Sequence, residues 1–230
     1  MTISHIMTGS QKSPNSKLSP AKARRERETL ERRDGILAAA RDLFFEHGIH
    51  RTTVEDVAAR AEVAKGTVYL HFESKETILA HLLLEGLDAL EESLAEAFAE
   101  AAALPAETRL RRLCAAYLDF FQNEQEYFRL MMAFDRGQFQ ESVTPEVYQQ
   151  ILTRSVKGLR WVVRAIEQGL ADGDFAVSDS KTTAGMFWSA INGALVIISH
   201  PLRRELLEQE VETLYNGVME LVLKGMKDGK

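Results

Sequence analysis

Cysteine is almost absent from this sequence. Cys114 is the only one in 230 residues, so the chain cannot form an internal disulfide, and a cysteine-based zinc site is excluded. Apolar runs such as Ala194 to Ile198 are far shorter than the roughly 20 residues that cross a membrane. The first thirty residues also lack the apolar core of a secretory signal peptide. These absences predict a cytoplasmic protein with no membrane partner.

Sequence signatures of catalysis are missing as well. The chain contains no G-x-S-x-G, no phosphate-binding glycine loop and no H-E-x-x-H. His47 and His50 are three residues apart, but no third metal ligand is evident near them. Cys114 lies on an apolar helical face, which is typical of inert core. The sequence therefore predicts neither an enzyme nor a metal or cofactor site.

Positive charge is scarce overall but unevenly distributed. The net charge is −6, yet residues 1–72 hold 12 Lys/Arg against 9 Asp/Glu, a surplus of three positive charges. The remaining residues hold 16 basic and 25 acidic side chains, a surplus of nine negative charges. A basic head on an acidic body is expected when only one end of a protein meets phosphate.

Helical periodicity runs through most of the chain. Residues 1–20 are rich in Ser, Pro, Lys and Asn and are predicted to be a disordered arm. Beyond them the apolar residues repeat with helical spacing, and no strand-type alternation or internal repeat of useful length is present. We therefore predict an all-α protein of about nine helices. It comprises a helix-turn-helix DNA-binding domain over 21–74 and a larger helical domain over 75–230, whose regulatory and dimerisation roles are implied only by a family resemblance.

Two short helices joined by a tight turn are predicted within residues 53–72. Thr52 and Thr53 each precede a carboxylate by three residues, so either could form a capping box. Ser74 is expected to cap a long fourth helix. The third helix presents polar and aromatic side chains on its outer face, all able to meet phosphate or base edges: Lys65, Gly66, Thr67, Tyr69 and His71.

Residues 52–58 and 63–76 together resemble the signature of the TetR/AcrR family of regulators, and the resemblance covers about residues 34–84. It implies that Thr53 and Lys75, at two helix N-termini, bind phosphate. The expected DNA-binding set is Thr52, Thr53, Lys65, Gly66, Thr67, Tyr69, His71 and Lys75.

The turn at Glu62 and the arginine-rich segment at residues 24–33 lie beside these motifs and bear on the predicted DNA-binding surface. Glu62 departs from the family's usual glycine in the turn, so we expect slight backbone strain there. The arginines at 24, 25, 27, 32 and 33 either form a solvated face with nearby glutamates or extend the first helix over the DNA backbone or minor groove.

By the same resemblance, the larger domain forms a homodimer. Gly185, Ser189 and Gly193 lie four residues apart, a small-residue stripe that lets two helices pack closely. One final amphipathic helix is predicted to complete the interface with Leu207, Val211, Leu214 and Val218. Close packing within one subunit is the alternative explanation of the stripe.

The resemblance also implies a small-molecule effector. The middle helices are rich in aromatic residues and methionines, which suit an apolar cavity, although most such residues are ordinary core. The candidate ligand-binding residues are Phe120, Phe128, Met131, Phe134, Trp161, Phe187 and Asn192. An apolar or aromatic effector is therefore expected.

These features lead to one functional hypothesis and one alternative. The hypothesis is a ligand-responsive regulator, a repressor by the family's usual sign, whose homodimer binds a palindromic double-stranded DNA operator. Its two recognition helices would sit about 34–36 Å apart, and an effector would release DNA by changing that spacing. The alternative, a helical adaptor that binds only protein, leaves the 65–75 segment unexplained.

Overall fold

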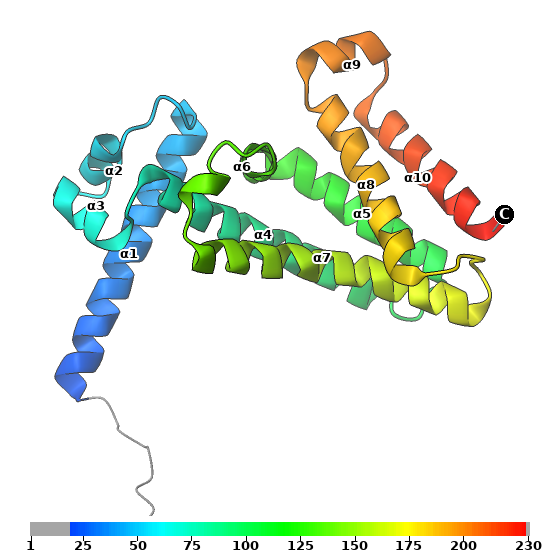
Figure 1. Cartoon of the computed structure of the whole chain (residues 1–230), viewed down its shortest axis with the longest axis horizontal. Coiled ribbons are helices and arrows are strands. Elements are labelled where there is room, and N and C mark those ends of the chain that lie inside the picture. The colour runs from blue at the N-terminus through cyan, green and yellow to red at the C-terminus, as the bar shows by residue number, and fades with distance from the viewer. Residues whose placement is uncertain (1–18, 229–230) are drawn as a thin grey trace, which may run out of the picture.

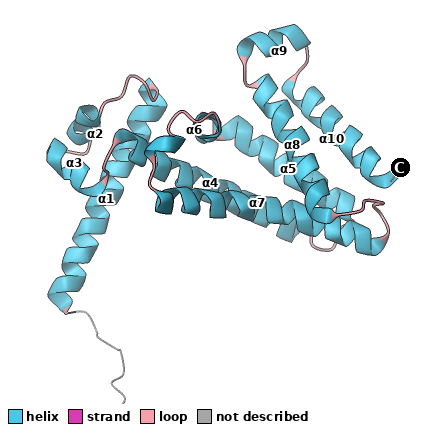
Figure 2. Cartoon of the chain, viewed as in Figure 1, coloured by secondary structure: helices cyan, strands magenta, loops and turns pink. Residues whose placement is uncertain are grey.

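The computed structural model describes residues 19–228, and that part of the chain contains helices but no strands (Figures 1 and 2). The predicted all-α class is thus confirmed. Ten α-helices and one short 3₁₀-helix follow one another: α1 Pro20–His47, α2 Val54–Arg60, α3 Lys65–His71, α4 Lys75–Glu100, α5 Ala106–Asn123, α6 Gln125–Asp135, η1 Gln140–Ser142, α7 Pro145–Asp172, α8 Ser180–Ile198, α9 Pro201–Leu207 and α10 Val211–Asp228.

The expected count of about nine helices is corrected at the C-terminal end. The single final amphipathic helix is in fact two helices, α9 and α10. Glu208 adopts a left-handed conformation with φ of 50° directly after Leu207, and this ends α9. Leu207 therefore does not share a helix with Val211, Leu214 and Val218.

The N-terminal arm predicted over 1–20 lies outside the described residues except for Ser19 and Pro20. Those two begin α1 instead, because the Ser19 side chain accepts a hydrogen bond from the Lys22 amide at 3.3 Å and Pro20 occupies the first turn. The result is a helix of 28 residues whose first half projects beyond the rest of the molecule (Figure 1).

The head consists of α1, α2 and α3, which pack around one apolar cluster. The second half of α1 contributes Ile36, Ala40 and Phe44, and α2 and α3 contribute Val57 and Val68, all buried. Residues of α1 before Arg33 take no part in this cluster. The cluster fixes α3 across the head and leaves its outer face free.

The body is a bundle in which α4 and α7 run side by side, with α5, α8 and α10 packed beyond them (Figure 1). Helix α4 belongs to both parts of the molecule. It begins at its predicted cap, where Ser74 Oγ accepts from the Thr77 amide at 3.1 Å, and it continues into the body core at Leu90 and Leu94. A displacement of α4 therefore moves the head relative to the body.

Polar contacts fasten the head to the body along α1. Arg41 donates a hydrogen bond to Glu85 on α4 at 3.0 Å, and the Tyr127 hydroxyl on α6 donates to the same carboxylate at 3.3 Å. The Phe45 ring meets the Tyr127 ring edge-on, with 5.2 Å between centroids. Three helices thus converge on Glu85.

Residues 19–228 lack two structural features. No single helix there is both long and apolar enough to cross a membrane, although α8 and α9 taken together, with a bend of 100°, reach the length and composition required. Nor do three His, Cys, Asp or Glu side chains gather anywhere in this part of the chain as metal ligands would.

Candidate nucleic-acid interface

The turn before α3 sets the angle of that helix. Thr53 caps α2 through a full capping box with Asp56, and the helix ends at Arg60. Glu62 follows with φ of 54°, so the expected strain at this non-glycine position is confirmed. The Val63 amide then donates to the Ala58 carbonyl at 2.9 Å, which closes the turn and starts α3 two residues later.

The outer face of α3 carries the predicted contact residues. Lys65 and Gly66 are exposed, Thr67 and His71 are half-buried, and only Val68 points into the core. A side chain at Gly66 would meet nothing within 4 Å, so the backbone is open to a close partner there. The structure thus brings these residues together on one surface.

Two large apolar side chains share this surface. Tyr69 is 45% exposed and Leu70 is 84% exposed. Leu70 was not among the predicted residues. An exposed leucine can make apolar contact with a partner, as with a thymine methyl group in the major groove of DNA.

Lys65 is held in place before any ligand arrives. Its ammonium pairs with Glu55 on α2 and lies 5.7 Å from the centre of the Tyr69 ring. The hydrogen bond with Glu55 raises the pKa of Lys65 above its ordinary 10.5, so the side chain is fully charged. Exposed ion pairs contribute little to stability, and a phosphate can therefore replace the carboxylate at small cost.

The two predicted threonines have different surroundings. Thr53 is exposed at the N-terminus of α2. Thr52 is only 2% exposed, and its hydroxyl donates to the Leu43 and Gly48 carbonyls at 3.2 and 3.1 Å. The structure therefore places Thr52 inside the head, where it locks the end of α1, and away from the surface expected for it.

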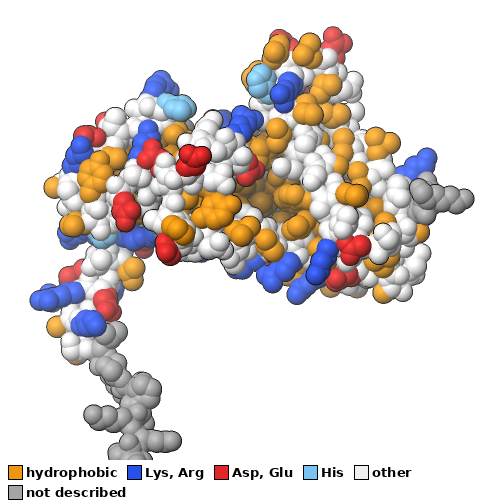
Figure 3. All heavy atoms as spheres, viewed as in Figure 1, with side chains coloured by type: hydrophobic (Ala, Val, Ile, Leu, Met, Phe, Trp, Pro, Cys, Tyr) orange, Lys and Arg blue, Asp and Glu red, His pale blue; other side chains and the backbone are white. Residues whose placement is uncertain are grey.

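Basic side chains flank α3 on two sides. Lys75, at the start of α4, is half-buried with its ammonium 5.9 Å from the Phe44 ring. Arg32 on α1 and Thr67 on α3 line one shallow hollow beside the α2–α3 turn. Farther out, Lys and Arg side chains stand on the projecting half of α1 (Figure 3), where Arg24 pairs with Glu28 at 3.1 Å. Both interpretations of the basic run stay open, since Arg24 is paired while Arg32 adjoins α3.

The candidate effector residues do not form one site. Met131, Phe134 and Asn192 line a cavity of about 220 Å³ in the body, together with Tyr117 and Trp188. Phe128 lines a separate cavity, while Phe120, Trp161 and Phe187 line neither. Phe120 and Phe187 are buried core residues, and Trp161 packs on Phe98 with ring centres 4.9 Å apart.

Asn192 is one of the polar residues that line the body cavity, together with Glu91, Asp135, Arg154 and Ser155. Its side-chain oxygen accepts a hydrogen bond from the Tyr117 hydroxyl at 2.8 Å, and Trp188 stacks on the Tyr117 ring with centres 4.6 Å apart. Burial raises the pKa of Tyr117, which therefore stays a neutral donor. The cavity thus offers two flat rings and an amide NH₂.

The predicted dimer face is open in this single chain. A side chain at Gly185 or Gly193 would meet nothing within 4 Å, and Ser189 between them is exposed. On α10, Val211, Leu214 and Val218 are half-buried. Two glycines absent from the prediction, Gly217 and Gly225, flank Leu221 on α10, and Leu221 is 73% exposed.

Comparison with known proteins connects these features to a family. Residues 36–82, from the core half of α1 into α4, match the family described as "Bacterial regulatory proteins, tetR family". The HTH-type transcriptional activator FasR of Mycolicibacterium smegmatis is 30% identical over 46% of this chain, which spans about half (47%) of FasR. The HTH-type transcriptional repressor KstR2 of the same species is 27% identical over 63% of this chain and 67% of KstR2.

Solved structures show the same fold. The regulator FadR from Bacillus subtilis, in complex with stearoyl-CoA, superposes with a TM-score of 0.62 at 22% identity, over 83% of this chain and 97% of FadR. The match to the family rests on the head, where the helix-turn-helix lies, and the likeness over the body is one of fold alone. Residues 36–82 of this chain therefore match the TetR family of bacterial regulatory proteins.

Proposed function

We propose that this protein is a transcriptional repressor whose homodimer binds a palindromic operator and releases it when a small effector binds in the body. One observation carries the DNA-binding part: the exposed face of α3, with Lys65, Gly66, Tyr69 and Leu70. Phosphate contacts at Thr53 and Lys75 flank it, because the helix N-termini of α2 and α4 supply free amide groups there. The head over 21–74 and the body over 75–230 divide these two tasks.

A binding experiment tests this surface. We expect tight, fragment-selective binding when the purified protein is titrated against labelled genomic fragments, including the region upstream of its own gene, in a fluorescence anisotropy salt series. The Lys65→Ala/Tyr69→Ala double variant should lose both affinity and selectivity. An Arg112→Ala variant is the control, because Arg112 is an exposed cation on α5, in the body and outside the proposed dimer face. Equal binding of all fragments by all three proteins would contradict the proposal.

The sign of regulation needs a separate measurement. KstR2 is named a repressor and FasR an activator, so relatives of both signs exist. We propose repression because a dimer seated on an operator blocks the polymerase without further contacts. A reporter gene behind the selected fragment should be transcribed less when the protein is present, and a rise in transcription would reverse the sign.

The effector site that we propose is the body cavity. Its two stacked rings and the Asn192 amide suit a small apolar or aromatic molecule with one hydrogen-bonding group. FadR, solved with stearoyl-CoA, shares this fold and binds a small molecule. A screen of aromatic compounds for release of labelled DNA tests the site, and Met131→Trp, which fills the cavity, should abolish release without reducing DNA binding.

A further inference from the structure

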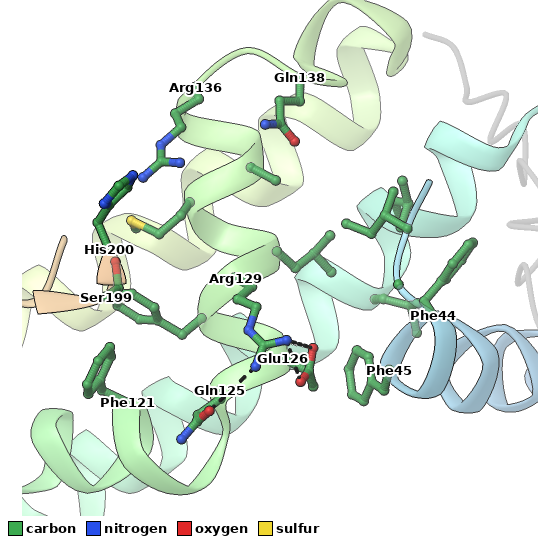
Figure 4. A pocket seen from close by; sticks show the side chains of 18 of the residues that line it. Phe44, Phe45, Phe121, Gln125, Glu126, Arg129, Arg136, Gln138, Ser199 and His200 are labelled. Carbon is green, nitrogen blue, oxygen red and sulfur yellow. Dashed lines mark hydrogen bonds and ion pairs between the residues drawn. The ribbon is translucent and has the colours of Figure 1, made fainter. Parts of the chain in front are cut away.

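A second cavity lies where the head meets the body. Its volume is about 570 Å³, larger than that of the body cavity. The head contributes the end of α1 at Phe44 and Phe45 and the following segment to His50. The body contributes α6 and the corner between α8 and α9 (Figure 4). We call it the junction cavity.

The wall of the junction cavity is apolar. Phe121 and Phe128 meet edge-on with ring centres 4.8 Å apart, and Met132 and Ile198 continue the same lining. These residues come from α5, α6 and α8, so the apolar surface is continuous across three elements. A surface of this kind binds a hydrocarbon or aromatic group by excluding water.

Arginines dominate the edge of the cavity. Three of them line it, Arg129, Arg136 and Arg204, against a single acid, Glu126. Glu126 pairs with Arg129 at 2.9 Å. No carboxylate of the described residues lies within 4 Å of the Arg136 or Arg204 guanidinium. Figure 4 shows Arg136 and His200 pointing toward one another on one side of the cavity. Two uncompensated cations thus border an apolar wall, in a body whose net charge is negative.

We propose that the junction cavity is a second ligand site, separate from the body cavity, that binds an amphipathic carboxylate. The apolar part of the ligand packs on the phenylalanines, Met132 and Ile198. Its carboxylate accepts hydrogen bonds from Arg136 and Arg204, because the planar guanidinium matches a carboxylate in geometry and charge.

Occupancy of this site bears directly on DNA binding. Residues of the head and the body line the same cavity, so a ligand there favours whichever relative orientation closes around it. Met132 lines both cavities, and the two sites therefore share a wall on α6. The coupling to DNA rests on the proposed function, whereas the ligand site itself does not.

Calorimetry of the DNA-free protein tests the site. The probes are octanoate and octan-1-ol, which share an alkyl chain and differ in charge. We expect octanoate to bind more tightly than octan-1-ol. The Arg136→Gln/Arg204→Gln variant should bind octanoate at least about ten-fold more weakly and octan-1-ol unchanged, because it removes two charge-assisted hydrogen bonds. Arg112→Gln, an exposed arginine of α5 outside both cavities, is the matched control.

Other outcomes would overturn the proposal. If octanoate fails to bind, or binds no better than octan-1-ol, the junction cavity is not a carboxylate site. Loss of octanoate binding in Met131→Trp but not in the double arginine variant assigns the ligand to the body cavity instead. Circular dichroism of each variant separates lost binding from lost folding. If octanoate binds through the two arginines but leaves the protein's affinity for a selected DNA fragment unchanged, only the coupling between the site and DNA binding is overturned. If the protein selects no DNA fragment, the proposed function is contradicted, but the calorimetric test of the ligand site still holds because it uses the DNA-free protein.

Discussion

Glu62 holds the turn between α2 and α3 in a left-handed conformation, with φ of 54°. This conformation costs an L-residue about 1–2 kcal/mol, and glycine avoids the cost while losing more freedom on folding. We expect Glu62→Gly to raise the free energy of unfolding by about 0.5–1 kcal/mol, or the Tm by about 2 °C for a chain of this size. Thermal denaturation followed by circular dichroism measures the change. Glu62→Ala keeps the strain and should leave the Tm unchanged, so an equal rise in both variants would point to the lost charge.

His81 makes stability depend on pH. Burial, together with the cationic Arg33 and Arg154, lowers the pKa of its imidazole from 6.5 to about 4, and the ring accepts a hydrogen bond from Arg33 at 3.0 Å. The unfolded state binds this proton more readily than the folded state. The contribution of His81 to the free energy of unfolding is therefore fully present above pH 6.5 and is lost as the pH falls toward 4. Tm measured from pH 7 to pH 4 should fall less steeply in His81→Gln than in the wild type. Parallel slopes would show that other groups control the acid limb.

Single residues also show which features of the site could be predicted from the sequence and which could not. Thr53 was expected to form a capping box and does, because that motif is purely local. Thr52, one position earlier, carries the same local pattern, yet the carbonyls that bury its hydroxyl belong to Leu43 and Gly48. These carbonyls lie at the end of α1, and only the folded structure of the head brings them to Thr52. Leu70 was missed because an apolar residue in an amphipathic helix is expected in the core, and only the structure shows that it is 84% exposed.

At the scale of elements, the contact between α4 and α6 depends on a missing side chain. A methyl group at Gly86 would lie 2.7–2.9 Å from the Tyr127 side chain, which hydrogen-bonds Glu85. We expect Gly86→Ala to lower the free energy of unfolding by about 1–3 kcal/mol, since the ring must move and its bond to Glu85 is lost. Gly35→Ala is the matched control, because nothing lies within 4 Å of that position and alanine favours the helix by about 1 kcal/mol. Urea denaturation of both variants compares the effects, and a stabilised Gly86→Ala would show that α6 adapts freely.

Helix starts were predictable and one helix end was not. Ser74 caps its helix where the local pattern placed it, and its side chain accepts a hydrogen bond from the amide three residues on, as Thr144 does at the start of α7. The break between α9 and α10 has no glycine or proline to announce it, since a glutamate at 208 takes the left-handed conformation. The amphipathic pattern continues across the break, so periodicity alone merged the two helices.

At the scale of the whole molecule, the division into a basic head and an acidic body followed from charge. The match of residues 36–82 to a family of bacterial regulatory proteins agrees with the prediction that the chain is not an enzyme. The two cavities did not follow. Aromatic residues and methionines were read as one ligand site, but packing separates Phe128 from Met131 and Asn192 and buries Phe120 and Phe187 entirely. The position of a cavity depends on how the side chains of several helices pack together, and no sequence pattern predicts it.

The open faces of α8 and α10 extend this reasoning to the dimer. Leu221 is 73% exposed, and the glycines four residues before and after it leave room for a close neighbour. In a twofold interface a substitution occurs on both subunits, so Leu221→Glu places two carboxylates in one apolar contact. We expect the wild type to be a dimer and Leu221→Glu a folded monomer in size-exclusion chromatography with light scattering. Leu152→Glu, an exposed leucine of α7, should stay dimeric. The monomer should also bind a palindromic fragment more weakly, because it meets one half-site at a time. If Leu221→Glu stays dimeric, the interface does not use α10, and the exposed Leu202 and Leu206 of α9 become the surface to test.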